Sequence, residues 1–474
     1  MAQMRQLVSL TINRNSARKS PYYLITVWTL IISVFLFYGL SSQVRLEIWG
    51  LLLLTFALLS LPPIVAALQN RFDIFEPLYL WMALWLYLFC FRPLFSVLEG
   101  TIVLETYFSK ALVISIIGLI YFYIGYFSRV GRQLAFRLPL IEGPYSSRVL
   151  RIDALAVAGL ALTLLVAFIQ ASGGFTAYFS VPHKQGGRYM DASTIFSTAY
   201  VWQAHEMLIP ASFLLYQNAL ERRKAGSFPL FMFFSLLAFY LFSGERDYTF
   251  DMIVSMFVFH YLRRGKRPSL IQISIIAGML FVILGLLPVY RMYFHLGADL
   301  FQIAAINPKE ALIGQALETH PSGDEFTAYT TTVALFPDYI NYGYGRAYLQ
   351  LFIHWIPRPL WPSKPGFENR PDYINNPINP IGAGYSDTIL GDFYSQFGVI
   401  AVILGMFISG VLWKTLYCYY KRSPTSPFTQ LLYTITLPTV LIYIAQSPHA
   451  WISQYPFFIF PVISAFLIAR RKRQ

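Results

Sequence analysis

Residues 48–68 read IWGLLLLTFALLSLPPIVAAL, a run without a single charged side chain. An α-helix rises 1.5 Å per residue, so this run forms a helix of about 30 Å, the thickness of the hydrocarbon core of a bilayer. Only 12% of the whole chain is charged, about half the share that is usual in soluble proteins. Because so little charge cannot cover a solvated surface, the run predicts a membrane-spanning helix.

The same pattern recurs along the chain. The other apolar runs of spanning length are 22–40, 75–96, 111–128, 152–169, 197–217, 228–243, 248–262, 270–289, 388–417, 428–445 and 453–469. We therefore predict an all-α polytopic membrane protein with about twelve transmembrane helices. The runs 228–243 and 248–262 are separated by only four residues, so they could instead form one re-entrant hairpin. The run 22–40 is too long for a signal-peptide core and lacks a cleavage site, so it is predicted to be a retained anchor.

The positive charges predict the orientation in the membrane. Of the 36 lysines and arginines, 24 lie in the segments that this topology places inside the cell. Positive charge near membrane ends stays on the cytoplasmic side, so we expect both termini in the cytoplasm and the chain in a plasma membrane. The net charge of +13 does not indicate nucleic-acid binding, because the charges lie in short clusters between apolar runs.

One external segment is much longer than the others. We predict a bundle of about nine spans in residues 1–290, a large loop in 291–386, and about three spans in 387–474. Long loops in compact proteins are usually functional.

Two short helices are expected inside this loop. The sequence Ser322-Gly-Asp-Glu325 matches a capping box that opens a helix through Phe336. Residues 345–356 have the spacing of an amphipathic helix at the membrane surface. Its predicted apolar stripe consists of Leu349, Phe352, Ile353 and Ile356.

Several arginines lie at the predicted external face. Arg246 follows Glu245 in the short turn before the eighth run, Arg291 ends the ninth run, and Arg346 and Arg358 lie in the loop. A guanidinium binds phosphate or carboxylate through two parallel hydrogen bonds. The arginines therefore indicate an anionic ligand such as a lipid pyrophosphate. Alternatively, each could bind lipid headgroups or pair with a nearby acid.

Carboxylates and one histidine are the candidates for proton transfer. Asp392 begins the tenth run and Asp387 precedes it, so each could be a general base or a helix N-terminal charge. Asp338 has no evident local structural role and is a further candidate. His354 lies beside arginines on the predicted surface helix, although it could be a surface histidine with no function. Glu325 is expected to be a helix cap rather than a catalyst.

The usual signatures of soluble enzymes are missing. The sequence has no phosphate loop, dinucleotide fingerprint, nucleophile elbow or metal-spaced Cys/His set. Cys90 and Cys418 are predicted at opposite membrane faces and are expected to be free thiols. Aromatic residues crowd the loop, Trp355 and Trp361 among them; they could stack on sugar rings or anchor the loop at the interface.

Three segments carry a family resemblance. The loop sequence IPRPLWPSKP at 356–365 and the sequence GAGYSDTILGDFYSQFG at 382–398 resemble the Wzy-type polymerases of O-antigen and related oligosaccharide repeat units. The sequence FSGER at 242–246 is similar to a third, looser element of that family. This likeness covers the second half of the chain, and the first half is similar in topology.

The resemblance implies a glycosyltransferase at the periplasmic face of a bacterial inner membrane. Such an enzyme joins oligosaccharide units linked to undecaprenyl pyrophosphate, which serve as donor and acceptor, and it needs no metal or other cofactor. Arg246, Arg291 and Arg358 would bind the pyrophosphates, and His354, Asp338 or Asp392 would orient or deprotonate the attacking hydroxyl. The further substrate-binding candidates are Arg346, Glu245, Trp355, Trp361, Lys364, Tyr385, Tyr394 and Asp387. A GT-C-like fold is expected, and a chain-length regulator is a further candidate partner.

Three other functions fit the same topology. A flippase or transporter of lipid-linked oligosaccharides usually shows two similar halves with short loops, which this sequence lacks. An O-antigen ligase differs from a polymerase in its acceptor, which the sequence does not reveal. A non-catalytic partner in polysaccharide assembly is the last alternative.

Overall fold

The computed structural model describes a set of segments that together cover most of the predicted spans. These are residues 46–69, 71–100, 102, 104–171, 174, 203–222, 227–241, 246–269, 271–276, 278–280, 282, 325–354, 356, 360–361, 363 and 388–470. The predicted span 22–40 lies outside them, as do the first residues of 197–217 and the end of 270–289. Within the described segments the regular secondary structure is helical, apart from one isolated β-bridge between Tyr145 and Arg470.

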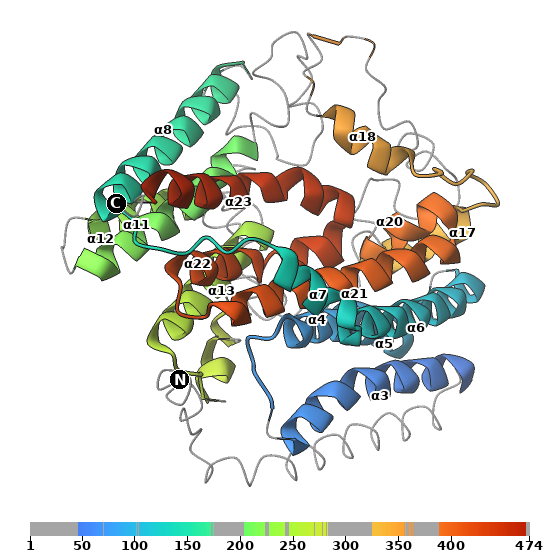
Figure 1. Cartoon of the computed structure of the whole chain (residues 1–474). Helices are drawn as coiled ribbons and strands as arrows, with labels where there is room; N and C mark the ends of the chain where they lie inside the picture. Colours follow the sequence, from blue (N-terminus) through green and yellow to red (C-terminus); the bar gives the residue numbers. More distant parts are fainter. Residues whose placement is uncertain are drawn as a thin grey trace, which may run out of the picture.

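The helices follow the apolar runs of the sequence (Figure 1). They are α3 (Leu46–Leu68), α4 (Pro77–Leu86), α5 (Arg92–Leu98), α6 (Glu105–Phe127), α7 (Arg129–Arg137), α8 (Ser147–Ala171), α11 (Leu208–Arg222), α12 (Ser227–Leu241), α13 (Arg246–Arg264), α17 (Glu325–Leu335), α18 (Arg346–His354), α20 (Thr388–Phe397), α21 (Val399–Arg422), α22 (Pro427–Thr436) and α23 (Pro448–Ala469). A π-helical turn, Tyr87–Phe91, joins α4 to α5, and a second one, Ile442–Gln446, precedes α23.

Six of the described helical segments are long and apolar enough to cross a membrane. They are Leu46–Leu68, Pro77–Leu98, Glu105–Phe127, Ser147–Gln170, Val399–Arg422 and Pro448–Ala469. The protein is therefore a helical membrane protein with several spans. Twelve spans and the GT-C-like arrangement stay predictions, as do the boundaries of the loop.

Two predicted spans differ from the structure. The run 388–417 is not one helix, because Gly398 adopts a φ of 62° and separates α20 from α21. The run 428–445 contains α22, then a turn at Pro438, then the π-helical turn. Glycine adopts a positive φ at little cost, and proline lacks the N–H that a continuing helix needs. Both breaks therefore follow from single residues that hydropathy does not weigh.

Helices α6 and α21 pack against each other through glycines. A Cβ atom at Gly125 would collide with the carbonyl oxygen of Phe407, and one at Gly410 would collide with that of Phe122. Small residues allow membrane helices to approach backbone to backbone. This contact fixes α21, and with it the position of α20 above it.

The segments that were assigned to the cytoplasm lie together at one end of the bundle. Asp73, in the loop before α4, accepts hydrogen bonds from Arg267 and Lys421 at 2.9 Å each. Glu76 accepts from Lys414 at 3.0 Å and from Tyr126 at 2.8 Å. These contacts join the loop after α3 to α6, to the segment after α13 and to α21. The cytoplasmic location of this end stays a prediction.

The loop helices lie at the other end of α6 and α21. The predicted helix after the capping box is present as α17, and the predicted amphipathic helix is present as α18. Helix α17 is packed against α6 and α20 (Figure 1), and the Tyr329 hydroxyl donates to the carbonyl oxygen of Ala111 at 3.1 Å. Because nearly every residue of α17 is buried, this helix is part of the bundle core.

Helix α18 shows its apolar stripe to the outside. The side chains of Leu349 and Phe352 are 66% and 81% exposed, whereas Leu351 is buried. An amphipathic helix with an outward apolar face is typical of a helix that lies in the membrane interface. The inward face of α18 packs toward α23 and α20.

Candidate functional site

The site is centred on a buried carboxylate of α20. Asp392 is 8% exposed, and the Tyr348 hydroxyl of α18 donates to its Oδ2 atom at 2.8 Å. The Tyr348 ring also stacks on Phe393, with ring centroids 6.4 Å apart. Asp392 lies beyond the first turn of α20, which begins at Thr388. Since the effect of the helix dipole fades within one turn, the reading of Asp392 as a simple N-terminal charge does not fit.

A tight loop positions Tyr348 for this contact. The backbone N–H groups of Gly343 and Tyr344 donate to the carbonyl oxygens of Ser395 and Gln396 at 2.8 and 3.0 Å. The N–H of Gly345 donates to the Gln396 side-chain oxygen at 3.1 Å. Gly345 adopts a φ of 81°, a conformation that favours glycine. The loop therefore binds the end of α20 and starts α18 beside Asp392.

Burial fixes the protonation state of the tyrosine. Burial, the charge of Asp392 and the hydrogen bond to it together raise the pKa of Tyr348 well above its ordinary value. Tyr348 therefore stays neutral at physiological pH and donates its proton toward Asp392. A hydrogen bond of this kind orients a carboxylate and favours its charged form.

Aromatic rings and a lysine surround the same end of α20. The Lys110 ammonium lies 5.8 Å from the ring centroid of Tyr394 and 5.9 Å from that of Tyr107. The rings of Tyr342 and Tyr394 meet edge to face at 6.1 Å. Burial and the hydrogen bond with Tyr394 raise the pKa of Tyr342 to about 12, against the opposing charge of Lys110. These groups offer polar edges and flat faces, the features with which proteins bind sugars and phosphates.

Asp338 lies near this cluster but in a different setting. It is exposed in the turn after α17, and its charge contributes to the raised pKa of Tyr342. The structure thus brings Asp338, Asp392 and Tyr394, all predicted from the sequence, into one region.

An ion pair beside the site was not predicted. Arg92 of α5 is 5% exposed, and its Nη2 atom lies 4.0 Å from Glu325 of α17. The same nitrogen donates to the Tyr87 hydroxyl at 2.6 Å. Glu325 is the first described residue of α17 and pairs with this arginine, while Ser322 of the predicted capping box lies outside the described residues. A charge inside an apolar run is costly, and that was the signal which could have singled out Arg92.

The other predicted site residues are described only in part. Arg346 is exposed at the start of α18, and Trp361 donates from its indole nitrogen to the Ser363 hydroxyl at 3.1 Å. Arg246 begins α13 and His354 ends α18, but their side chains lie outside the described residues. The residues that lie wholly outside are Glu245, Arg291, Trp355, Arg358, Lys364, Tyr385 and Asp387. The predicted arginine cluster therefore stays a prediction.

Metal-binding and redox groups complete the inventory. Among the residues that the structure describes, no group of three or more His, Cys, Asp or Glu side chains could hold a metal ion. Cys90 and Cys418 are both free, as predicted. The chemistry available in the described region is that of a buried carboxylate, neutral tyrosines and a lysine.

Comparison with known proteins gives the family. No curated protein and no solved structure matches the chain. A family model described as "O-antigen polysaccharide polymerase Wzy" matches residues 23–473, and so includes the first half of the chain, which carried no motif. Because this match spans nearly the whole sequence, the protein belongs to the Wzy family of membrane-bound O-antigen polysaccharide polymerases.

Proposed function

We propose that the protein polymerises oligosaccharide repeat units linked to undecaprenyl pyrophosphate, at the end of the bundle where α17, α18 and α20 meet. The observation that carries this proposal is the buried carboxylate of Asp392, which lies in the segment that resembles the polymerase motif. The Tyr348 hydroxyl orients this carboxylate. We place this end of the bundle at the periplasmic face, in keeping with the distribution of lysine and arginine.

The reaction transfers the growing chain from its lipid to the next unit. A hydroxyl at the non-reducing end of the acceptor attacks the anomeric carbon of the donor sugar. The bond from that carbon to the pyrophosphate oxygen breaks, and its electron pair leaves with undecaprenyl pyrophosphate. The proton of the attacking hydroxyl passes to a base.

Asp392 is the base that the geometry supports best. Tyr348 fixes its Oδ2 atom, so the carboxylate has a defined direction before substrate binds, which lowers the cost of reaching the reactive arrangement. Asp338 is exposed and is better suited to a peripheral contact. His354 remains the alternative base, since it ends the helix that carries Tyr348.

Cations are needed for the leaving pyrophosphate. Charge that develops in the transition state is stabilised most strongly by donors already in position. We assign this role to Arg246, Arg291 and Arg358, with Lys110, whose ammonium lies 5.8 Å from the ring centroid of Tyr394, as a further cation at this end of α20. Arg291→Ala and Arg358→Ala are expected to abolish polymer formation while leaving membrane insertion intact. Arg246→Lys is also expected to fail, because an ammonium cannot replace a planar two-point donor.

The test uses the full chain in nanodiscs with a synthetic repeat unit on undecaprenyl pyrophosphate. A ladder of chain lengths with equal release of free undecaprenyl pyrophosphate, unchanged by a chelator, is expected. An unreacted substrate would contradict the polymerase assignment. Adding a lipid A core acceptor would then detect a ligase, and movement of labelled substrate across a vesicle membrane would detect a flippase.

Comparing Asp392→Asn with Asp338→Asn tests the choice of base. The first variant is expected to lose polymer formation, and the second to retain most of it. The reverse result would move the base to Asp338, and activity in both would favour His354.

A further inference from the structure

A second potential ligand site lies at the opposite end of the bundle. A hollow of about 460 Å³ opens between α7 and α21, at the end predicted to face the cytoplasm, and its lining residues are Arg132, Phe136, Leu140, Cys418, Lys421 and Arg422. Three of these residues are cations and none is a carboxylate. The remaining lining residues are apolar, so the hollow combines positively charged and hydrophobic surfaces.

Helix α7 has the character of an interfacial helix. Its small residues Gly131 and Ala135 are buried, and Gly131 approaches the backbone of Val411 so closely that a Cβ atom would lie 2.9 Å from its carbonyl oxygen. On the outer side Leu134 and Phe136 are 41% and 59% exposed. A short helix that follows a membrane span and exposes both apolar and basic side chains lies in the headgroup layer.

The cations differ in how far they are already engaged. Arg422 donates to the carbonyl oxygens of Ala135 and Leu138 at the end of α7. These hydrogen bonds position its guanidinium. Lys421 donates to Asp73 at 2.9 Å. Arg132 lies 5.9 Å from the ring centroid of Phe136 and is exposed. A phosphate in the hollow would meet the remaining N–H groups of two arginines, each of which has five donors.

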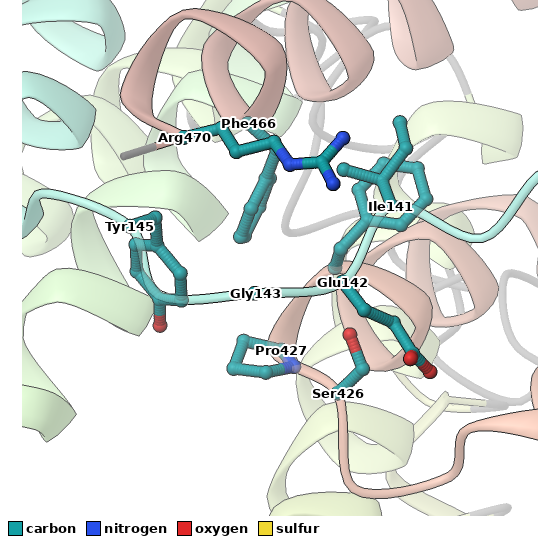
Figure 2. A pocket seen from close by; sticks show the side chains of 9 residues that line it. Ile141, Glu142, Gly143, Tyr145, Ser426, Pro427, Phe466 and Arg470 are labelled. Carbon is teal, nitrogen blue, oxygen red and sulfur yellow. The ribbon is translucent and has the colours of Figure 1, made fainter. Parts of the chain in front are cut away.

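A neighbouring hollow on the same face is too small to bind a ligand. Figure 2 shows Arg470 extending over the segment that carries Ile141, Glu142 and Gly143. That hollow has a volume of only about 20 Å³ and includes a carboxylate in its lining. It has room for about one water molecule, whereas the hollow beside α7 can hold a phosphate headgroup.

We propose that the hollow between α7 and α21 binds the headgroup of an anionic glycerophospholipid of the inner leaflet. The arginines bind the phosphate, and Phe136 and Leu140 contact the start of the acyl chains. An inorganic phosphate would make no contact with acyl chains along the apolar side of the hollow. A zwitterionic lipid would bring the cation of its own headgroup close to the three cations of the hollow. Basic pockets between membrane helices bind acidic headgroups in this way.

Cys418 provides a measurement on the unaltered protein. This thiol lines the hollow and is half-buried, while Cys90 is fully buried and serves as the internal reference. The full chain in detergent is treated with a maleimide, and labelling of each cysteine is followed by mass spectrometry. We expect phosphatidylglycerol to slow labelling of Cys418 at least threefold, and phosphatidylcholine with the same acyl chains to slow it much less.

A pair of matched variants tests the role of charge. Arg132→Gln removes a cation that lines the hollow, and Arg137→Gln removes one from the same helix that does not line it. The first is expected to abolish the preference for phosphatidylglycerol, and the second to preserve it. Equal protection by both lipids, equal protection by glycerol phosphate alone, or the same loss in both variants would overturn the proposal. If Arg132→Gln does not fold, the lipid comparison on the unaltered chain still decides.

Discussion

The two ends of the bundle each contain an aspartate, half-buried at Asp73 and buried at Asp392, and their surroundings differ. Asp73 is bound by two cations, Arg267 and Lys421, and by the Tyr417 hydroxyl at 3.0 Å. Asp392 is bound by the Tyr348 hydroxyl at 2.8 Å. Helix α21 connects the two regions. Only Gly398 separates its first residue from α20, and Lys421 lies at its other end.

We propose that Asp73 is a structural carboxylate and that Asp392 is the reactive one. The charge of Asp73 is neutralised by Arg267, which follows α13, and by Lys421 of α21, so it joins elements that are far apart in sequence. The Tyr348 hydroxyl donates to the carboxylate of Asp392 and orients it, inside the segment that resembles the polymerase motif. We therefore expect changes at Asp73 to affect stability, and changes at Asp392 to affect catalysis.

The largest expected effect is that of Asp392→Asn. An amide cannot accept the proton, and the loss of a general base costs about 10²–10⁴ in rate. The size of the side chain and its contact with Tyr348 are retained, so the protein should fold normally. Polymer length distribution and release of undecaprenyl pyrophosphate measure the rate, and thermal unfolding in detergent measures the fold.

The opposite behaviour is expected of Asp73→Ala. This change removes the acid that Arg267 and Lys421 share. Since both cations are partly exposed, we expect about 1–3 kcal/mol less stability, between the values for exposed and for buried pairs. Activity per folded molecule should be unchanged. Chemical unfolding of the purified variant measures the first quantity, and the polymerisation assay measures the second. If Asp73→Ala lost activity while remaining folded, the division between the two ends would be wrong.

Hydropathy and charge predicted that basic residues far apart in the sequence gather at one end of the bundle, which we propose is the cytoplasmic, or inner, end. Arg267, Lys414 and Lys421 were assigned to the cytoplasmic side from their positions next to apolar runs, and they lie together around Asp73 and Glu76. This succeeds because the cost of burying charge in lipid acts locally, on each run separately. The choice of partners was not predictable, since it depends on how distant helices pack.

The outer end was predictable only in its elements. The capping box and the 3.6-residue period located α17 and α18, and the motif around Asp392 indicated a functional segment. The contact of Tyr348 with Asp392 depends on the turn at Gly343 and Gly345, which binds the end of α20. Hydropathy does not detect such a turn, so the residue that positions the carboxylate was missed.

A smaller effect is expected of Tyr348→Phe. This change removes the hydrogen bond but retains the stacking on Phe393, and one such bond to a charged group contributes about 1.5 kcal/mol, or about tenfold in rate. Since the bond favours the charged carboxylate, the acidic limb of the pH–rate profile should move to higher pH. A merely structural role would lower the rate equally at every pH. Tyr344→Phe, on the same loop, is the matched control and should leave the profile in place.

The smallest effect concerns the pH dependence of stability at Asp73. Burial alone would raise the pKa of this carboxyl, but the nearby charges of Arg267 and Lys421 outweigh burial and lower it. A carboxyl with a lower pKa in the folded than in the unfolded protein stabilises the fold above its unfolded value, about 4, and this contribution disappears as the pH falls through the folded value. The difference in unfolding temperature between the wild type and Asp73→Asn should therefore be constant from pH 8 to 5 and shrink below about pH 4. A difference that shrank already between pH 7 and 5 would mean that Asp73 is protonated more readily than its two cations allow, and that its charge does not stabilise the inner end.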